Sequence, residues 1–343
     1  MPSLDELKAL LQDFRATASH EDREDLKTFI ADTFFDLVSH DHTNELADTM
    51  EQLQAVAEDI RPHVDVSGDF PSTKSSTWPQ SGEFSELNPE TTVVYDDFLY
   101  PDSLVDQMMD DGTIPSHYCN HCGSHDTAPL DIISHSAPVP ALAAVFRFIL
   151  PAAMFPNQLV VSPADVDRMR TMTLVDVGSR LGPVLFGAAV LADFGRLVGL
   201  EISAEYNDLV SKVAAARGYG QISVQQCDVT SPAAKGALSQ ADVLYIHNVF
   251  DFFVDPARII AAWSAVIDNI TTGRTRPGFA VTKPSLETML GNAGMGQADI
   301  ARALAKFTQV DSTEAKAVAC KEITALEDRQ DVIDDITVYT IAP

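Results

Sequence analysis

Short apolar runs alternate with amphipathic stretches along the second half of the chain, which predicts strands and helices in turn. The runs are rich in Val, Leu and Ile and are bounded by Gly or charged residues, as buried strands usually are. The predicted strands cover residues 173–178, 196–202, 222–229, 241–249 and 278–283, with a closing pair at 307–310 or 315–320 and at 337–341. The predicted helices cover 183–194, 204–217 and 285–306, with further helices opened by Ser231-Pro232 and Asp255-Pro256. This alternation requires a parallel sheet with helices on both faces, so an α/β, doubly wound fold is predicted.

The first half of the chain has a different pattern. Apolar residues at helical spacing predict helices within residues 3–60, including 22–38 and 44–60. Pro, Ser, Thr and Gly accumulate in the following stretch, as in a linker or a long surface loop. The predicted organisation is a helical N-terminal region at 1–62, a linker or loop at 63–92, a Pro- and His-rich connecting region at 93–164, and the α/β domain at 165–343.

The turn after the first predicted strand carries the most specific signal. In Asp176-Val-Gly-Ser-Arg-Leu-Gly182, Gly178 lets the chain leave the strand with an unusual φ, and Gly182 lies where the next helix must approach the strand. Pro183 then takes the first helical position, and Gly195 is predicted to end the helix. A strand, a glycine turn and a helix N-terminus together form a common binding site for nucleotide-like ligands, although a lone turn of this kind occurs in many α/β proteins.

Polar residues close the following strands as well. Glu201 ends the second predicted strand, Asp228 the third and Asn248 the fourth. Acids at successive strand ends suit a ligand with a ribose diol and an adenine amine. An NAD-dependent oxidoreductase is disfavoured because Gly-x-Gly-x-x-Gly is absent and Asp176 precedes the turn.

With these motifs, residues 160–343 resemble the class I, Rossmann-like S-adenosylmethionine-dependent methyltransferases. The resemblance implies a seven-stranded sheet with an antiparallel last strand, which residues 337–341 suit. It implies that the turn holds the methionine end of the cofactor, that the second strand end holds the ribose, that the third faces the adenine, and that the loop after the fourth lies beside the methyl group. The matching cofactor-binding positions are Asp176, Gly178, Ser179, Gly182, Glu201, Ile202, Asp228, Val229, Asn248, Val249 and Phe250.

One position departs from the family pattern, because Arg180 stands where the motif usually has a middle glycine. Its side chain could crowd the cofactor, or swing away and leave a backbone N–H facing it. A third alternative is that its guanidinium pairs with the cofactor carboxylate. Arg180 is therefore counted among the cofactor-binding residues in two of the three alternatives.

Candidate catalytic residues follow the fourth strand. His247 and Asp251 flank Asn248 and could act as a base or as orienting groups, although His247 is also placed as a core histidine would be. The Asn/Asp-Pro-Pro-aromatic motif of amide and nucleobase methylation is absent, which disfavours DNA and glutamine as targets. Lys283 is predicted to be structural.

A cluster of Cys and His residues lies in the connecting region. Cys119-x-x-Cys122-Gly has the spacing of a zinc knuckle, and Cys119, Cys122, His125 and His135 could complete a structural Cys₂His₂ zinc site. Two free thiols in a loop are the alternative, and a redox pair is less favoured because such pairs usually open a helix after a strand.

Net charge limits the choice of substrate. The chain has 23 Lys and Arg against 50 Asp and Glu, which gives 23 − 50 = −27. Because so acidic a protein repels phosphate backbones, a nucleic-acid substrate is not expected. A basic protein partner or a small molecule is compatible with this charge, which also favours solubility by itself.

The substrate prediction rests on short strings. Asp-Val-Gly-Ser, Asn-Val-Phe and Thr282-Lys-Pro284 are similar to the non-SET histone-lysine methyltransferases, so a protein side chain is predicted, with lysine first. The alternatives are a small metabolite, and a degenerate fold in which Arg180 blocks the cofactor and the helical N-terminus binds a partner.

The cellular setting is predicted from what the sequence lacks. The N-terminal residues are acidic and helical rather than typical of a signal or transit peptide. The longest apolar stretch, 137–155, contains Arg147 and three prolines, so no membrane span is predicted. Four cysteines do not make a disulfide framework. A cytoplasmic location is expected, with the nucleus as the alternative.

Overall fold

The computed structural model describes residues 46–72, 83–120, 127–129, 131–134, 136–156, 163–247, 258–323 and 330–343, and the single residues 14, 19, 78 and 250. The chain divides into two compact units, Met1–Asp48 and Thr49–Pro343. Most of the first unit, with the predicted helix over 22–38, lies outside the described residues. The predicted boundaries at residues 62, 92 and 164 stay predictions. The second unit contains all the strands that the structure describes.

A seven-stranded sheet forms the centre of this unit, in the order β10-β11-β9-β8-β5-β6-β7. Its strands are β5 (Thr173–Val177), β6 (Arg196–Glu201), β7 (Ile222–Gln226), β8 (Val243–His247), β9 (Gly278–Lys283), β10 (Phe307–Val310) and β11 (Thr337–Ile341). β11 pairs antiparallel with both β9 and β10. The other four pairings, β7 with β6, β6 with β5, β5 with β8 and β8 with β9, are parallel. The predicted seven-stranded Rossmann-like sheet with an antiparallel last strand is therefore confirmed. Of the two segments proposed for the sixth strand, 307–310 is correct, and 315–320 lies in a helix.

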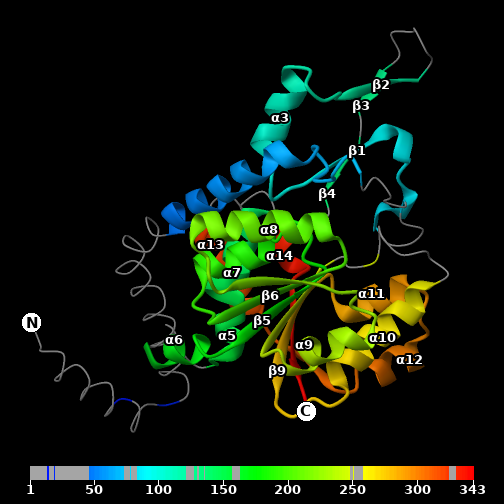
Figure 1. The fold of residues 1–343 in the computed structure, drawn as a ribbon. Helices are drawn as coiled ribbons and strands as arrows, with labels where there is room; N and C mark the ends of the chain where they lie inside the picture. Colours follow the sequence, from blue (N-terminus) through cyan, green and yellow to red (C-terminus); the bar gives the residue numbers. More distant parts are fainter. Residues whose placement is uncertain are drawn as a thin grey trace, which may run out of the picture. The chain divides into compact units, whose positions relative to one another are not determined.

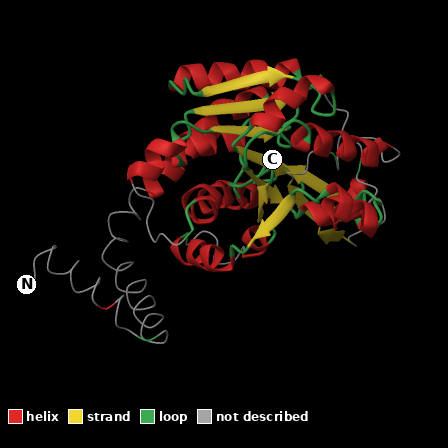
Figure 2. Ribbon diagram, turned by 90° about the horizontal axis from the view of Figure 1, so that it is seen from below, coloured by secondary structure: helices red, strands yellow, loops and turns green. Residues whose placement is uncertain are grey.

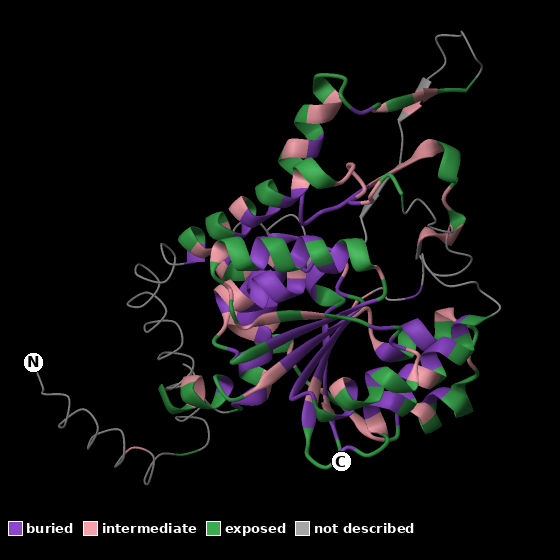
Figure 3. Ribbon diagram, viewed as in Figure 1, coloured by how far each residue is buried: buried purple, intermediate pink, exposed green. Residues whose placement is uncertain are grey.

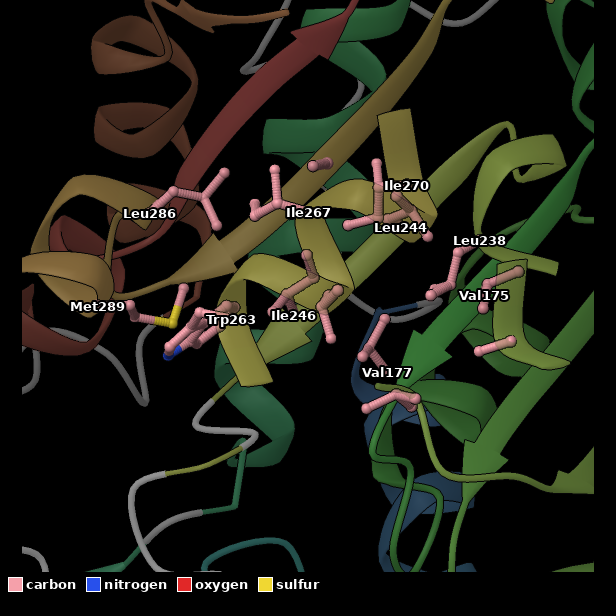
Figure 4. Packing of buried hydrophobic residues seen from close by; sticks show 14 of the residues in the cluster. Val175, Val177, Leu238, Leu244, Ile246, Trp263, Ile267, Ile270, Leu286 and Met289 are labelled. Carbon is pink, nitrogen blue, oxygen red and sulfur yellow. The ribbon is translucent and has the colours of Figure 1, made fainter. Parts of the chain in front are cut away.

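Helices cover both faces of the sheet (Figures 1 and 2). One face carries α7 (Pro183–Leu191), α8 (Ala204–Arg217), α13 (Thr313–Glu322) and α14 (Gln330–Asp334). The other carries α9 (Lys235–Gln240), α10 (Ile259–Thr271), α11 (Leu286–Asn292) and α12 (Gln297–Ala303). In Figure 4 the inner faces of these helices meet the strands through side chains such as Trp263, Ile267 and Leu286. Because both faces are covered, the central strands are mostly apolar, and Figure 3 shows them buried.

Two predicted helices end differently in the structure. α7 stops at Leu191 rather than at 194, because Ala192 takes an extended conformation. A Cβ on Gly195 would lie 1.8 Å from the Arg170 carbonyl oxygen, so this glycine permits a close backbone approach rather than ending the helix. The single helix predicted over 285–306 is two helices, α11 and α12, separated by a turn in which Gly294 has a positive φ.

The residues before the sheet form smaller elements. A helix over residues 49–60 is followed by η1 (Arg61–His63), η2 (Glu83–Glu86) and η3 (Pro89–Thr91). The connecting region contains the parallel pair β1 (Thr92–Tyr95) and β4 (Asp131–Ser134), α3 (Asp102–Asp110), and the antiparallel pair β2 (His117–Cys119) and β3 (Thr127–Pro129). The buried segments α4 (Val139–Ala144), η4 (Val145–Ile149) and α5 (Leu150–Met154) lead to α6 (Pro163–Met169). Among the described residues, no helix combines the length and apolarity needed to span a bilayer.

Candidate cofactor site

The strand order reverses direction beside β5. From β5 the chain proceeds outwards to β6 and β7, and then returns to the other side of β5 to form β8. This reversal is a topological switch point, and open α/β sheets bind ligands beyond the carboxyl ends of the strands at such points. The turn after β5, the end of β6 and the end of β8 meet there, which is where the sequence predicted the cofactor.

The turn after β5 has the backbone geometry expected of its glycines. Gly178 and Gly182 have φ values of 78° and 75°, and Gly178 and Ser179 both donate N–H groups to the Leu200 carbonyl of β6. A Cβ on Gly182 would lie 3.2 Å from Val210 in α8, so this glycine also permits a close approach. The turn is thus fixed against β6 and opens α7, as predicted.

Glu201 connects the end of β6 to this turn. Its carboxylate accepts hydrogen bonds from the backbone N–H of Arg180, at 3.0 Å, and from that of Ser203, at 2.8 Å. Glu201 is buried, whereas the next residue, Ile202, is 65% exposed. The strand end therefore combines a fixed, buried carboxylate with an exposed aliphatic side chain.

Arg180 occupies the position of the missing glycine and takes its conformation. With a φ of 43°, it is the only residue other than glycine with a positive φ among those that the structure describes. Its guanidinium pairs with Asp96 at 2.7 Å and with Asp69 at 2.9 Å. Of the three sequence-based alternatives, the side chain therefore extends to the N-terminal segment, and the backbone N–H faces Glu201.

The positive charge of Arg180 is neutralised by carboxylates of the protein itself. Burial alone would lower the pKa of the Arg180 guanidinium, but the carboxylates of Asp96 and Asp69 outweigh burial and raise it. The pairing of Arg180 with a cofactor carboxylate is therefore not its arrangement in this structure. Asp69 and Asp96 were not predicted as site residues. The available signal was the unusual Asp96-Asp97 pair inside the apolar run from Val93 to Tyr100.

Asp176 lies on β5 just below the turn. It is buried, and its register partners are Gly199 on β6 and Tyr245 on β8. Burial, and secondarily the nearby Glu201 carboxylate, raise the pKa of Asp176 to about 8. A carboxyl whose pKa lies near neutrality at a strand end is a feature of many binding sites.

The third strand ends earlier than predicted. β7 stops at Gln226, so Asp228 lies in a following turn, where its Oδ1 accepts hydrogen bonds from the N–H and hydroxyl of Thr230. Val229 is buried beside it. Cys227 donates its N–H to the Glu201 carbonyl, which keeps this turn beside the end of β6.

The end of β8 brings two basic side chains together. His247 is in register with Lys283, the last residue of β9. Burial, and secondarily the Lys283 ammonium, lower the pKa of His247 to about 3, so its imidazole is neutral at physiological pH. Asn248, Val249 and Asp251 lie outside the described residues. Phe250 is buried and packs edge-on against Trp263, at 4.9 Å between ring centroids.

The predicted zinc site falls largely outside the described residues, because Cys122, His125 and His135 are not among them. Cys119 is exposed at the end of β2. Within the part of the chain that is described, no group of three or more His, Cys, Asp or Glu side chains is arranged to hold a metal ion. The zinc site stays a prediction.

Comparison of the sequence with protein-family models gives no match, and comparison with curated proteins gives none. Solved structures with a similar arrangement include geranyl diphosphate C-methyltransferase from Streptomyces coelicolor A3(2), which is 15% identical over 52% of this chain and 74% of that one, with a TM-score of 0.30. The fibrillarin/Nop5p complex is 11% identical over 56% and 79%, with a TM-score of 0.31. The YcgJ protein from Bacillus subtilis is 12% identical over 51% and 95%, also with 0.31.

These values are too low for any ligand or activity to be carried over. The fold follows from the topology itself: a parallel sheet with its switch point at β5, closed by an antiparallel β11 inserted between β9 and β10. The second unit of the chain has the fold of the class I, Rossmann-like methyltransferases.

Proposed function

We propose that the protein is an S-adenosylmethionine-dependent methyltransferase. The observation that supports this most strongly is the position of Glu201, which closes the strand next to the switch point and fixes the glycine turn through the Arg180 N–H. The antiparallel β11 favours this family over dinucleotide-dependent enzymes, whose sheets are entirely parallel in the two-halves Rossmann arrangement.

The residues at the strand ends suit the proposed cofactor. A carboxylate has about four acceptor positions, so Glu201 can accept ribose hydroxyls besides its two backbone N–H groups. Ile202 offers an open apolar surface for the adenine, and Asp228 with Val229 follows at the next strand end. Asp176 and the turn residues Gly178, Ser179 and Gly182 are proposed to hold the methionine end.

Bound S-adenosylmethionine supplies an activated sulfonium methyl group, which transfers in line to a nucleophile. The chain's part is to orient the acceptor in its deprotonated form. A neutral His247 at the end of β8 can accept a hydrogen bond from an amine, and we propose it as an orienting group together with Asn248 and Asp251. Because a pKa of about 3 makes its imidazole a weak base, an ammonium acceptor would lose its proton to water. The acceptor's new N–C bond forms as the methyl group leaves the sulfur.

A protein side chain, with lysine first, is the proposed acceptor. The support is the net charge of −27, which attracts basic partners and repels nucleic acid. A small metabolite is the alternative acceptor, favoured by the position of residues 65–72 beside the turn, where Arg180 and Tyr206 bind them. The second candidate function is a protein-binding module without catalysis. Its support is the arginine side chain at position 180, where the family motif has a glycine.

Calorimetric titration with S-adenosylmethionine and S-adenosylhomocysteine tests the proposal. We expect micromolar binding that weakens at least about tenfold, or ~1.4 kcal/mol, in Glu201→Gln and Asp176→Ala. Asp242→Asn is the matched control, because Asp242 is also a buried carboxylate but accepts the Thr173 N–H at the opposite end of the sheet. The absence of binding by folded wild-type protein would favour the binding module.

A further inference from the structure

We propose that Arg180 is a positioning residue that fastens residues 65–72 beside the adenosine half of the cofactor site, so that cofactor binding and docking of this segment stabilise each other. This inference rests on the proposed function. It assigns a role to the one position at which the glycine turn departs from the family pattern, and it assigns residues 65–72 as a wall of the site.

The backbone of Arg180 is the first observation. A left-handed φ of 43° disfavours any residue with a Cβ, by roughly 1–2 kcal/mol. Glycine would avoid this strain, so the arginine side chain must contribute interactions that offset it. Its guanidinium makes them with Asp96, with Asp69 and with the Ser67 carbonyl, all of which belong to the segment before the sheet.

The ion pairs of this cluster are buried. The side chains of Arg180 and Asp96 are 11% and 1% exposed, and Asp96 also accepts the Ser136 hydroxyl at 2.5 Å. Breaking a buried pair by removing one partner leaves an uncompensated charge, which is strongly unfavourable unless the segment moves and water enters. The buried pair with Asp96 fixes the guanidinium, and its contacts with Asp69 and the Ser67 carbonyl couple residues 65–72 to the turn that Glu201 holds.

Close packing extends the coupling along the segment. A Cβ on Gly68 would lie 2.9 Å from both Asp96 Oδ2 and Leu181 Cδ1, and its φ is 76°. The Tyr206 hydroxyl donates to the Gly68 carbonyl at 3.2 Å and to Asp69 at 3.0 Å. The guanidinium also lies over the Tyr206 ring, 5.6 Å from its centroid.

The segment then runs along the start of α8. Phe70 packs on Tyr206 with ring centroids 5.1 Å apart, and Ser72 donates to Glu205 at 2.9 Å. Glu201 and Ile202 lie between the glycine turn and the first turn of α8. Residues 65–72 contact both of these flanking elements. A ligand held by Glu201 is bordered by residues 65–72, and by linkage each stabilises the other.

The test combines cofactor binding with hydrogen exchange of the 65–72 backbone in Arg180→Gly, which restores the family residue and removes the backbone strain. Asp69→Asn is the second variant, because it keeps the side-chain shape and retains the Asp96 pair. Arg217→Gln is the matched control: Arg217 pairs with Asp59 at 2.7 Å and fastens the 49–60 helix to the other end of α8.

In the wild type we expect S-adenosylhomocysteine to slow exchange in 65–72 at least about tenfold, as linkage requires. In Arg180→Gly and Asp69→Asn, exchange in the cofactor-free protein should rise, and the cofactor should dissociate at least about tenfold faster, or ~1.4 kcal/mol. Arg217→Gln should change neither quantity.

Two results would overturn the inference while leaving the proposed function intact. One is wild-type binding without any change in exchange over 65–72. The other is wild-type or tighter binding by Arg180→Gly and Asp69→Asn, which would mean that the cluster obstructs the site or has no effect on it. Absence of cofactor binding by the wild type would instead overturn the proposed function, and the inference with it.

Discussion

Single buried ionisable groups give the strand ends their chemical character. Asp176 and His247 lie at adjacent strand ends, and burial shifts the pKa of each towards its neutral form, raising the first to about 8 and lowering the second to about 3. The sheet therefore presents a protonated carboxyl and a neutral imidazole near pH 7. Each of these two pKa shifts leads to a prediction of its own.

For Asp176, we expect stability to fall as pH rises. Its folded pKa of about 8 lies above the unfolded value, so the folded state binds more protons between these two values. The unfolding free energy should decline by up to about 1.4 kcal/mol per pH unit between ~4 and ~8 through this group alone. Urea unfolding at several pH values, compared with Asp176→Asn, isolates the contribution. Parallel pH profiles for the two proteins would contradict the prediction.

For His247, we expect no titration between pH 5 and 8. The folded pKa of about 3 lies below the unfolded value, so stability from this group is lost as pH falls below about 6.5, when the unfolded chain takes up the proton. NMR of the imidazole protons measures this directly, with His247→Gln identifying the signal among the nine histidines. A midpoint near 6.5 for this signal would contradict the prediction that burial and Lys283 suppress protonation, and it would make His247 a base of ordinary strength.

At the scale of elements, glycines set how closely the turn approaches the sheet. A Cβ on Gly199 of β6 would lie 2.5 Å from Ser179 Oγ and 2.8 Å from Leu185 Cδ1. We expect Gly199→Ala to lower the unfolding free energy by about 1–3 kcal/mol through overpacking and to displace Ser179 in the turn. Thermal unfolding and cofactor titration measure the two effects.

Gly291 in α11 is the matched control, because a Cβ there would have nothing within 4 Å. Gly291 lies in the last turn of α11 without a positive φ, so Gly291→Ala should raise stability by about 0.4–1 kcal/mol and leave cofactor affinity unchanged. If both variants bound the cofactor as the wild type does, the position of Ser179 would not matter for binding.

The strands of the sheet and the turn after β5 were predictable because their signals are local. Apolar runs located the strands, and Gly178, Gly182 and Pro183 located the turn. The sequence did not decide which of two segments forms the sixth strand, because a short, weakly apolar stretch is compatible with either a strand or a helix. The predicted end of α7 was wrong because Gly195 permits a close approach to the Arg170 backbone instead of ending the helix. This is a contact between separate segments, and the spacing of apolar residues does not encode it.

The Arg180 cluster was not predictable for the same reason. Asp69 and Asp96 lie 111 and 84 residues before Arg180 in sequence. The sequence left three conformations of the arginine open, and only the positions of these carboxylates decide among them. The backbone of the turn was therefore predictable where one strand end carries its own signal, and the side-chain contacts were not predictable where distant segments meet.

At the scale of the whole molecule, charge should govern which acceptor the protein meets. A net charge of −27 produces a long-range attraction for basic partners that salt screens, with a Debye length of about 10 Å at 0.1 M and ~3 Å at 1 M. Uncharged metabolites experience no such attraction. Salt dependence thus separates the two proposed acceptor classes without knowledge of the specific substrate.

We expect methylation of a lysine-rich peptide at subsaturating concentration to slow at least about tenfold between 50 and 500 mM salt, because steering by charge acts on association. Titration of the cofactor at both salt concentrations is the necessary control, since a weaker cofactor complex would also slow the reaction. A neutral peptide of the same length should show little change. If the lysine-rich and neutral peptides reacted at equal, salt-independent rates while cofactor binding held constant, recruitment of a basic protein by charge would be excluded, and the small-metabolite acceptor would be favoured instead.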